Sequence, residues 1–408
     1  MTDGPERALM VYAGPRRGAD LAFYLEELRG LCEAAGAEVA GDVVQNLPQP
    51  DAHGYLGSGK LTETAQDAAE LGATLLVAAD SLSSRQEREL ERQTHLKIVD
   101  RTALILDIFA QRAITQEGKL QVELAQLTYL LPRLRRSAGS LSRLGGGIGT
   151  RGPGESKLES DRRRLRQRIA ELERRLAVVE RQRAVSRQER RDTARVALVG
   201  YTNAGKSTLL HALTQGGGGG EDRLFATLDP LTRRLLLPNR QEVLLTDTVG
   251  FVQDLPTELV AAFRATLEET VFADILLHVV DASHPEWQRQ MDAVQATLRA
   301  IGAGDLPQIE VFNKIDRLAP SAASGLPGVA VSATARLGIE GLRAAISDRL
   351  RERRVLRLFV IPLSRGDILA QVRAHGEVLK EEASETDMRV EALIDRAWAG
   401  RIASQLHD

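Results

Sequence analysis

The sequence contains a single cysteine, Cys32, among 408 residues. A lone cysteine excludes an internal disulfide and a thiolate metal cluster, and it favours a reducing compartment. The seven histidines are scattered, with no pair at the spacing of metal ligands. No apolar run approaches the ~18 residues that a membrane span needs, and the first 17 residues lack the apolar stretch of a signal peptide. We therefore expect a cytoplasmic protein with no membrane span.

The small net charge of −2 hides a strong asymmetry. Residues 133–192 hold 18 lysines or arginines against 8 acidic residues, so this segment carries +10 and the remainder carries −12. Such segregation is typical of a nucleic-acid-facing element on an acidic body. The chain length is that of about three domains.

Residues 1–115 alternate short apolar runs with amphipathic stretches. The apolar runs predict strands at 8–14, 37–44, 73–80 and 96–100, and the stretches between them predict helices at 20–35, 60–71 and 83–93. This alternation predicts an N-terminal α/β domain with a mostly parallel sheet.

Residues 116–192 follow a helical period instead. Apolar residues repeat every three or four positions in two series: Leu120, Leu124, Leu127, Leu131 and Leu134, then Leu158, Leu165, Ile169, Leu172, Leu176 and Val179. Neither helix can bury its stripe alone, so we expect an antiparallel helical hairpin. Pro132 should end or kink the first helix, because it lacks an N–H donor.

The glycine-rich segment "GGGIGTRGPGES" (145–156) lies at the tip of this hairpin. It contains G-x-G-x-x-G, but no strand precedes it, so we reject a dinucleotide site. Glycines allow close approach to another surface. One interpretation is an RNA-binding tip and the other is a solvated loop. The candidate phosphate contacts are Arg133, Arg135, Arg136, Arg143 and Arg151.

A second glycine-rich stretch, "GYLGSGKL" (54–61), nearly matches a phosphate-binding loop. Leu61 stands where a Mg²⁺-binding hydroxyl is needed, and no strand leads into the segment. We expect a loop or a helix start there.

The segment "RVALVGYTNAGKST" (195–208) has the full context of a P-loop: an apolar strand, G-x-x-x-x-G-K-S and an apolar helix. Backbone N–H groups of such a loop cradle phosphates. We expect Lys206 to reach the β- and γ-phosphates and Ser207 to bind Mg²⁺.

Further motifs follow in the order that a GTPase requires. "DTVG" (247–250) predicts Asp247 as a Mg²⁺ partner and Gly250 as the sensor of the γ-phosphate. "NKID" (313–316) places Asp316 to accept hydrogen bonds from guanine, with Asn313 and Lys314 as braces. Thr227 is the candidate switch I threonine, and Thr232 is the alternative.

The predicted site divides into overlapping sets. Lys206, Thr227 and Gly250 are the expected catalytic residues, and Ser207, Thr227 and Asp247 the expected metal ligands. The nucleotide-binding residues are predicted to be Gly200, Tyr201, Thr202, Asn203, Ala204, Gly205, Lys206, Ser207, Thr208, Phe225, Ala226, Thr227, Leu228, Asp229, Asp247, Thr248, Val249, Gly250, Asn313, Lys314, Ile315, Asp316, Ser332, Ala333 and Thr334.

Two positions bear on the rate of hydrolysis. Phe251 stands where Ras-like enzymes carry a water-orienting glutamine, so it is either a core residue or a sign of slow intrinsic turnover. Asn203 either binds K⁺ or only caps the loop. Residues 193–353 are expected to form the GTPase domain and residues 354–408 a small α/β domain; Gly216–Gly220 predict a flexible lead-in to switch I.

The chain resembles the HflX family, within the Obg–HflX group of translation-factor-related GTPases. The likeness rests on "GYTNAGKST", "LFATLDP", "DTVGF", "NKID" and above all "GGGIGTRGPGESKLE" after "LTYLLPRL". It implies a cytoplasmic GTPase that takes GTP or GDP with Mg²⁺ and binds the large (50S) ribosomal subunit and its RNA, in ribosome splitting, rescue or biogenesis. We expect a monomer. The five-glycine run departs from the family pattern.

Two other functions compete with this interpretation. An ATP-driven RNA-remodelling enzyme is disfavoured by Asn313 and Asp316, which select guanine. A non-enzymatic RNA-binding protein with a structural nucleotide is disfavoured by Thr227 and Asp247, because a static site needs no sensor of the γ-phosphate.

Overall fold

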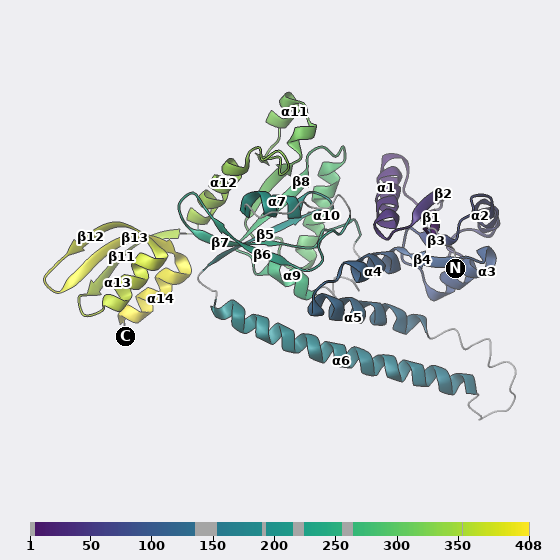
Figure 1. Cartoon of the computed structure of the whole chain (residues 1–408), viewed down its shortest axis with the longest axis horizontal. Helices are drawn as coiled ribbons and strands as arrows, with labels where there is room; N and C mark the ends of the chain where they lie inside the picture. The colour runs from purple at the N-terminus through teal and green to yellow at the C-terminus, as the bar shows by residue number, and fades with distance from the viewer. Residues whose placement is uncertain are drawn as a thin grey trace.

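The computed structural model describes residues 5–134, 153–189, 193–214, 224–254, 264–352 and 354–407. Its strands form three separate sheets, in residues 7–100, 194–330 and 354–395, and a long helical pair runs beneath the first two in the view of Figure 1. The predicted class, α/β regions joined by a helical pair, is confirmed. No helix among the described residues is long and apolar enough to cross a membrane.

The N-terminal sheet has the order β2-β1-β3-β4, and all its pairs are parallel. Its central strand is buried on both sides, as parallel sheets require. The predicted loop at 54–61 leads into a helix, as expected. The elements are β1 (Arg7–Gly14), α1 (Gly18–Ala34), β2 (Glu38–Asn46), α2 (Ser58–Glu70), β3 (Leu75–Ala78), α3 (Ser84–Thr94), β4 (Lys97–Asp100) and α4 (Arg101–Arg112).

The helical pair consists of α5 (Gln116–Arg133) and α6 (Pro153–Glu189), which lie side by side and run in opposite directions (Figure 1). Arg168 of α6 binds Glu123 of α5 through two hydrogen bonds, of 2.7 and 2.9 Å. Pro132 lies one residue before the end of α5. The glycine-rich tip, with Arg135, Arg136, Arg143 and Arg151, lies outside the described residues.

Helix α5 has a second buried face that we did not predict. The leucines of its predicted stripe are only half-buried, whereas Gly118, Gln121, Val122 and Ala125 are its most buried residues. Val122 and Ala125 belong to a core cluster that the N-terminal region shares with the central region. Helix α5 is therefore packed between α6 and the rest of the protein.

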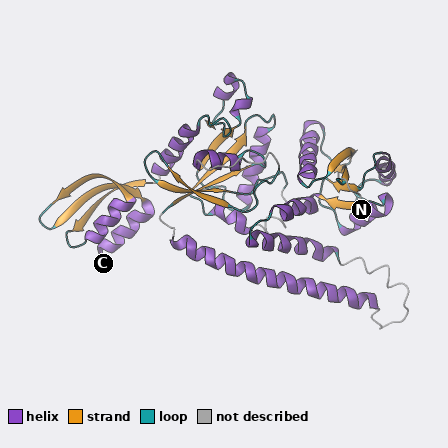
Figure 2. Cartoon of the chain, in the orientation of Figure 1, coloured by secondary structure: helices purple, strands orange, loops and turns teal. Residues whose placement is uncertain are grey.

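The central sheet has the order β10-β9-β8-β5-β7-β6, with β6 alone antiparallel to its neighbour. Figure 2 shows helices on both faces of this sheet. The run Gly216–Gly220 lies outside the described residues. The elements are β5 (Ala194–Gly200), α7 (Lys206–Thr214), β6 (Leu231–Leu236), β7 (Glu242–Asp247), α9 (Arg264–Val271), β8 (Ile275–Asp281), α10 (Trp287–Ala300), β9 (Gln308–Asn313), the 3₁₀ turn η3 (Ile315–Arg317), α11 (Pro320–Ser324), β10 (Val329–Ala330) and α12 (Ile339–Arg351).

The C-terminal region is a three-stranded antiparallel sheet, β11-β13-β12, with two helices on one face (Figure 2). Phe359, Ile361, Ile368 and Ile402 form its core. The elements are β11 (Arg354–Pro362), α13 (Gly366–His375), β12 (Gly376–Ala383), β13 (Asp387–Asp395) and α14 (Arg396–His407).

Candidate nucleotide site

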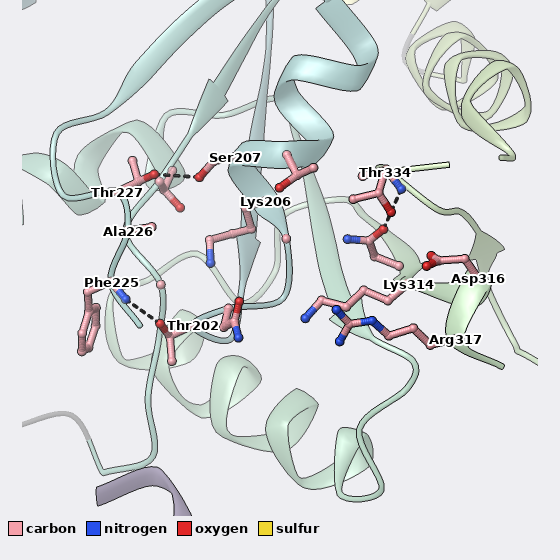
Figure 3. Close-up of a pocket in the computed structure, with 17 residues that line it drawn as sticks. Thr202, Lys206, Ser207, Phe225, Ala226, Thr227, Lys314, Asp316, Arg317 and Thr334 are labelled. Carbon is pink, nitrogen blue, oxygen red and sulfur yellow. Dashed lines mark hydrogen bonds between the residues drawn. The ribbon is translucent and has the colours of Figure 1, made fainter. Parts of the chain in front are cut away.

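A cavity lies at the carboxyl ends of the central strands, which is where ligands bind open α/β sheets. It is lined by residues of the P-loop, of switch I, of the loop after β7 and of the loops after β9 and β10 (Figure 3). Gly205 has φ +90°, and a Cβ there would lie 2.3 Å from Nδ2 of Asn313. Only glycine fits this position, because both the backbone conformation and the space exclude a side chain.

Lys206 is buried, and its ammonium donates hydrogen bonds to the carbonyls of Gly200 at 3.1 Å and Tyr201 at 3.0 Å. Burial lowers the pKa of Lys206 to about 8, although the Asp247 carboxylate opposes that shift. Burial likewise raises the pKa of Asp247, against the effect of Lys206. The two groups therefore form a low-dielectric site with one cation and one anion.

Three oxygen-bearing side chains meet beside Lys206. The Ser207 hydroxyl donates to Oδ2 of Asp247 at 2.6 Å and lies 2.7 Å from the Thr227 hydroxyl. Oδ1 of Asp247 is buried and has no hydrogen-bond partner within the described structure. Mg²⁺ prefers hard oxygen ligands, and this orphaned oxygen with two adjacent hydroxyls fits it.

The alternative switch I residue, Thr232, lies elsewhere. Its hydroxyl is 2.9 Å from that of Thr246, across the β6–β7 pair. Of the two candidates it is thus Thr227 whose hydroxyl reaches Ser207.

The loop after β9 (residues 313–316) is hydrogen-bonded to the P-loop through Asn313. Its Nδ2 donates to the Ala204 carbonyl at 2.9 Å, and its Oδ1 accepts from the Ala333 N–H at 3.0 Å. Lys314, Asp316 and Thr334 line the cavity nearby (Figure 3). The loops that we predicted to recognise guanine are thus held in one place by a single amide.

Two residues at this end of the cavity escaped the sequence analysis. Arg317 lines it, with proximity to Asp316 as the only sequence signal. Asp281, at the end of β8, pairs with Lys314 at 2.7 Å. Burial would raise the pKa of Asp281, but the Lys314 ammonium and the Ser283 hydroxyl outweigh it and lower the pKa.

The segment after β7 packs tightly against the P-loop. A Cβ at Gly250 would lie 2.8 Å from Cα of Thr202, so this glycine allows the close approach. Phe251 is fully buried, and its backbone pairs with Gly200 and Thr202 through hydrogen bonds of 3.1 and 2.7 Å. Its ring is a core side chain and cannot orient a water molecule.

Three of the predicted site residues make other contacts in the structure. Leu228 is buried in the cluster that includes the N-terminal region, and the Asp229 carboxylate binds the start of α5. Both side chains therefore leave the nucleotide cavity, contrary to our expectation. Arg133 donates to Oδ2 of Asp100 and to the Leu82 carbonyl, each at 2.9 Å, so its guanidinium forms intramolecular contacts that we did not predict.

Family models match most of the chain. One described as "GTP-binding GTPase N-terminal" matches residues 23–110, one described as "GTP-binding GTPase Middle Region" matches 112–190, and one described as "50S ribosome-binding GTPase" matches 195–314.

Curated relatives cover nearly the full length. GTPase HflX of Caldanaerobacter subterraneus is 46% identical over 370 residues, 90% of this chain and 86% of the relative. GTPase HflX of Lacrimispora saccharolytica is 46% identical over 395 residues, 95% of this chain and 93% of the relative. Among solved structures, a GTP-binding protein from Sulfolobus solfataricus in complex with GDP is similar at 23% identity, with a TM-score of 0.44 over 85% of this chain and 99% of that chain.

Proposed function

The chain belongs to the HflX family of GTPases, and from that premise we propose that it binds the large ribosomal subunit in a manner controlled by GTP. The observation that carries this proposal is the junction of two parts: a cavity lined by the P-loop, and a basic helical pair whose helix α5 packs into the core beside it. Ribosome splitting, rescue and biogenesis are all compatible with such a switch, which we expect to act as a monomer in the cytoplasm.

Mg²⁺ is the proposed cofactor of hydrolysis. Ser207, Thr227 and Asp247 would hold it, and when bound it neutralises charge on the phosphates. Lys206 supplies the second positive charge at the phosphate end of the cavity. Gly250 allows the segment that follows β7 (residues 248–254, here called switch II) to approach the P-loop. These residues bind and orient the triphosphate.

Slow intrinsic turnover is proposed from Phe251. Because its ring is buried, it leaves the water-orienting role to another group, and a group supplied in trans can raise such a rate by ~10³–10⁵. We also propose that K⁺ binds beside Asn203, whose side chain is exposed at the cavity. Hydrolysis should then be faster in KCl than in NaCl, and equal rates would leave Asn203 as a loop cap.

Three exposed arginines of α6 support the ribosomal half of the proposal. Arg163, Arg174 and Arg181 form no ion pair with any side chain that the structure describes, and Arg174 donates a hydrogen bond to the Ala170 carbonyl at 3.0 Å. Their spacings of eleven and seven residues return to nearly the same side of a helix, opposite the buried Leu172. Such a row is suited to the phosphates of RNA.

Co-sedimentation with purified 50S subunits tests the proposal. We expect binding with a non-hydrolysable GTP analogue, weaker binding with GDP, and a GTPase rate that rises at least tenfold on addition of subunits. Binding that ignores the nucleotide, together with equal turnover in the presence and absence of subunits, would contradict it. ATP serves as the competitor: an RNA-remodelling ATPase would bind ATP in place of GTP.

A further inference from the structure

Switch I contacts the N-terminal helices as well as the nucleotide cavity. The Thr227 hydroxyl lies at Ser207, while two residues later the Asp229 carboxylate accepts hydrogen bonds from the backbone N–H groups of Ile114 and Thr115, both at 2.9 Å. The Thr115 hydroxyl also donates to this carboxylate. One short segment thus joins the proposed metal site to the first turn of α5.

The start of α5 is shaped for this carboxylate. Thr115 is the N-cap of the helix, and its hydroxyl oxygen accepts from the Gly118 N–H at 3.0 Å. A Cβ on Gly118 would lie 2.3 Å from Oδ1 of Asp229, so any larger residue would push the carboxylate away. A negative charge at a helix N-terminus is also favoured by the helix dipole. The N-cap residue Thr115 and the space left by Gly118 therefore both favour the contact between the start of α5 and the Asp229 carboxylate.

The rest of switch I leaves little room for independent movement. The Phe225 ring is buried and packs edge-on against Phe109 of α4, with centroids 4.7 Å apart. The Phe225 N–H donates to the Thr202 hydroxyl at 2.8 Å. Only Leu228 separates Thr227 from Asp229, and consecutive Cα atoms are 3.8 Å apart. Displacement of Asp229 must therefore displace Thr227.

We propose that Asp229 is a positioning residue, which holds Thr227 at the metal site by anchoring switch I to α5. Switch I threonines engage Mg²⁺ and the γ-phosphate only in the triphosphate state. Seating of α5 on Asp229 and binding of GTP must then favour each other, because coupling between two sites is reciprocal. Nucleotide state is thereby communicated to the α5–α6 pair. This inference depends on the nucleotide site and not on the proposed ribosome binding.

The test uses two variants that break the contact from opposite sides. Asp229→Asn removes the charge, and Gly118→Ala inserts a methyl group on α5, where alanine otherwise favours the helix. We expect each variant to weaken the binding of a non-hydrolysable GTP analogue with Mg²⁺ by about 5- to 20-fold and the binding of GDP by less than twofold. Gly59→Ala is the matched control, because a Cβ at this helical glycine meets no atom within 4 Å.

Hydrogen exchange distinguishes coupling from a purely structural contact, because a contact that ignores the nucleotide would give the same amide exchange rates with GTP and with GDP. In the wild type, the amides of Ile114 and Thr115 should exchange more slowly with the GTP analogue than with GDP. The proposal is overturned if both variants change the two affinities by the same factor, or if these amides exchange equally in the two nucleotide states. Either result would overturn the role of Asp229 without contradicting the proposed binding of the 50S subunit.

Discussion

At the scale of the residue, Asn313 shows how one side chain can serve both ends of a nucleotide site. Its amide joins the Ala204 carbonyl, 109 positions earlier in the chain, to the Ala333 N–H. The motif N-K-x-D predicts its role beside guanine but says nothing of the bond to the P-loop. That bond depends on the pairing of β5, β8 and β9, which brings the two loops together.

Lys206 provides a prediction at this scale. Burial disfavours its ammonium, so the folded protein should lose the Lys206 proton at lower pH than the unfolded chain, while Lys206→Met should abolish GTP binding. The folded-state pKa, about 8, lies below the ordinary value of 10.5, and between them the unfolded state binds more protons. The wild type should therefore gain stability relative to the variant as the pH rises from 8 toward 10.5.

Urea unfolding of both proteins across this pH range measures the effect. The exposed Lys119→Met is the control, and it should change the free energy of unfolding by no more than about 0.5 kcal/mol. A difference in the free energy of unfolding between the two proteins that stays constant from pH 8 to 10.5 would contradict the argument.

At the scale of the element, α5 and α6 differ in what the sequence can reveal. The leucine period predicted both helices and their pairing, because an apolar stripe on a solvated helix must be covered. It did not predict that Val122 and Ala125 of α5 belong to a core cluster shared by the N-terminal and central regions. Small residues carry little signal in a hydrophobic pattern, and burial of the second face depends on the body that α5 meets.

The arginines of α6 provide a second prediction. Replacing Arg163, Arg174 and Arg181 by glutamine should lower the affinity for 50S subunits at least tenfold at moderate salt and reduce the slope of log K against log[salt] by about 2–3. The control replaces Arg162, Arg168 and Arg175, which lie on the same helix but pair with carboxylates, so the change in charge is identical. Equal loss in the two triple variants would show a response to net charge alone.

At the scale of the whole molecule, the N-terminal region contacts switch II as well as switch I. Glu27 and Arg101 form an ion pair with both side chains buried. Arg101 donates to the Gln253 carbonyl at 2.9 Å, and Glu27 accepts from the Gln253 N–H at 3.2 Å. The contact joins α1 and α4 to the segment that follows Phe251. Both switches therefore lie at the interface between two parts of the chain.

This ion pair provides a third prediction. Glu27→Gln leaves the Arg101 charge buried without its partner and should lower the free energy of unfolding by about 3–5 kcal/mol. The double variant Glu27→Leu with Arg101→Met should recover most of that loss, because it removes both charges. Asp20→Asn breaks the half-exposed pair with Arg289 between the same regions and should cost at most about 1 kcal/mol. Denaturant unfolding compares the three, and a double variant as unstable as Glu27→Gln would contradict the argument.

Motif spacing was sufficient to predict the P-loop, the cavity-lining Ser207 and the loop around Asn313, because these depend on backbone conformations and side-chain chemistry that lie within a few residues of one another. Which residues contact switch I and switch II depends on tertiary packing. Asp229 meets α5 across 114 and 115 positions, and Gln253 meets Glu27 across 226. No local pattern encodes such contacts, since they arise only when separately folded regions bury their surfaces against each other.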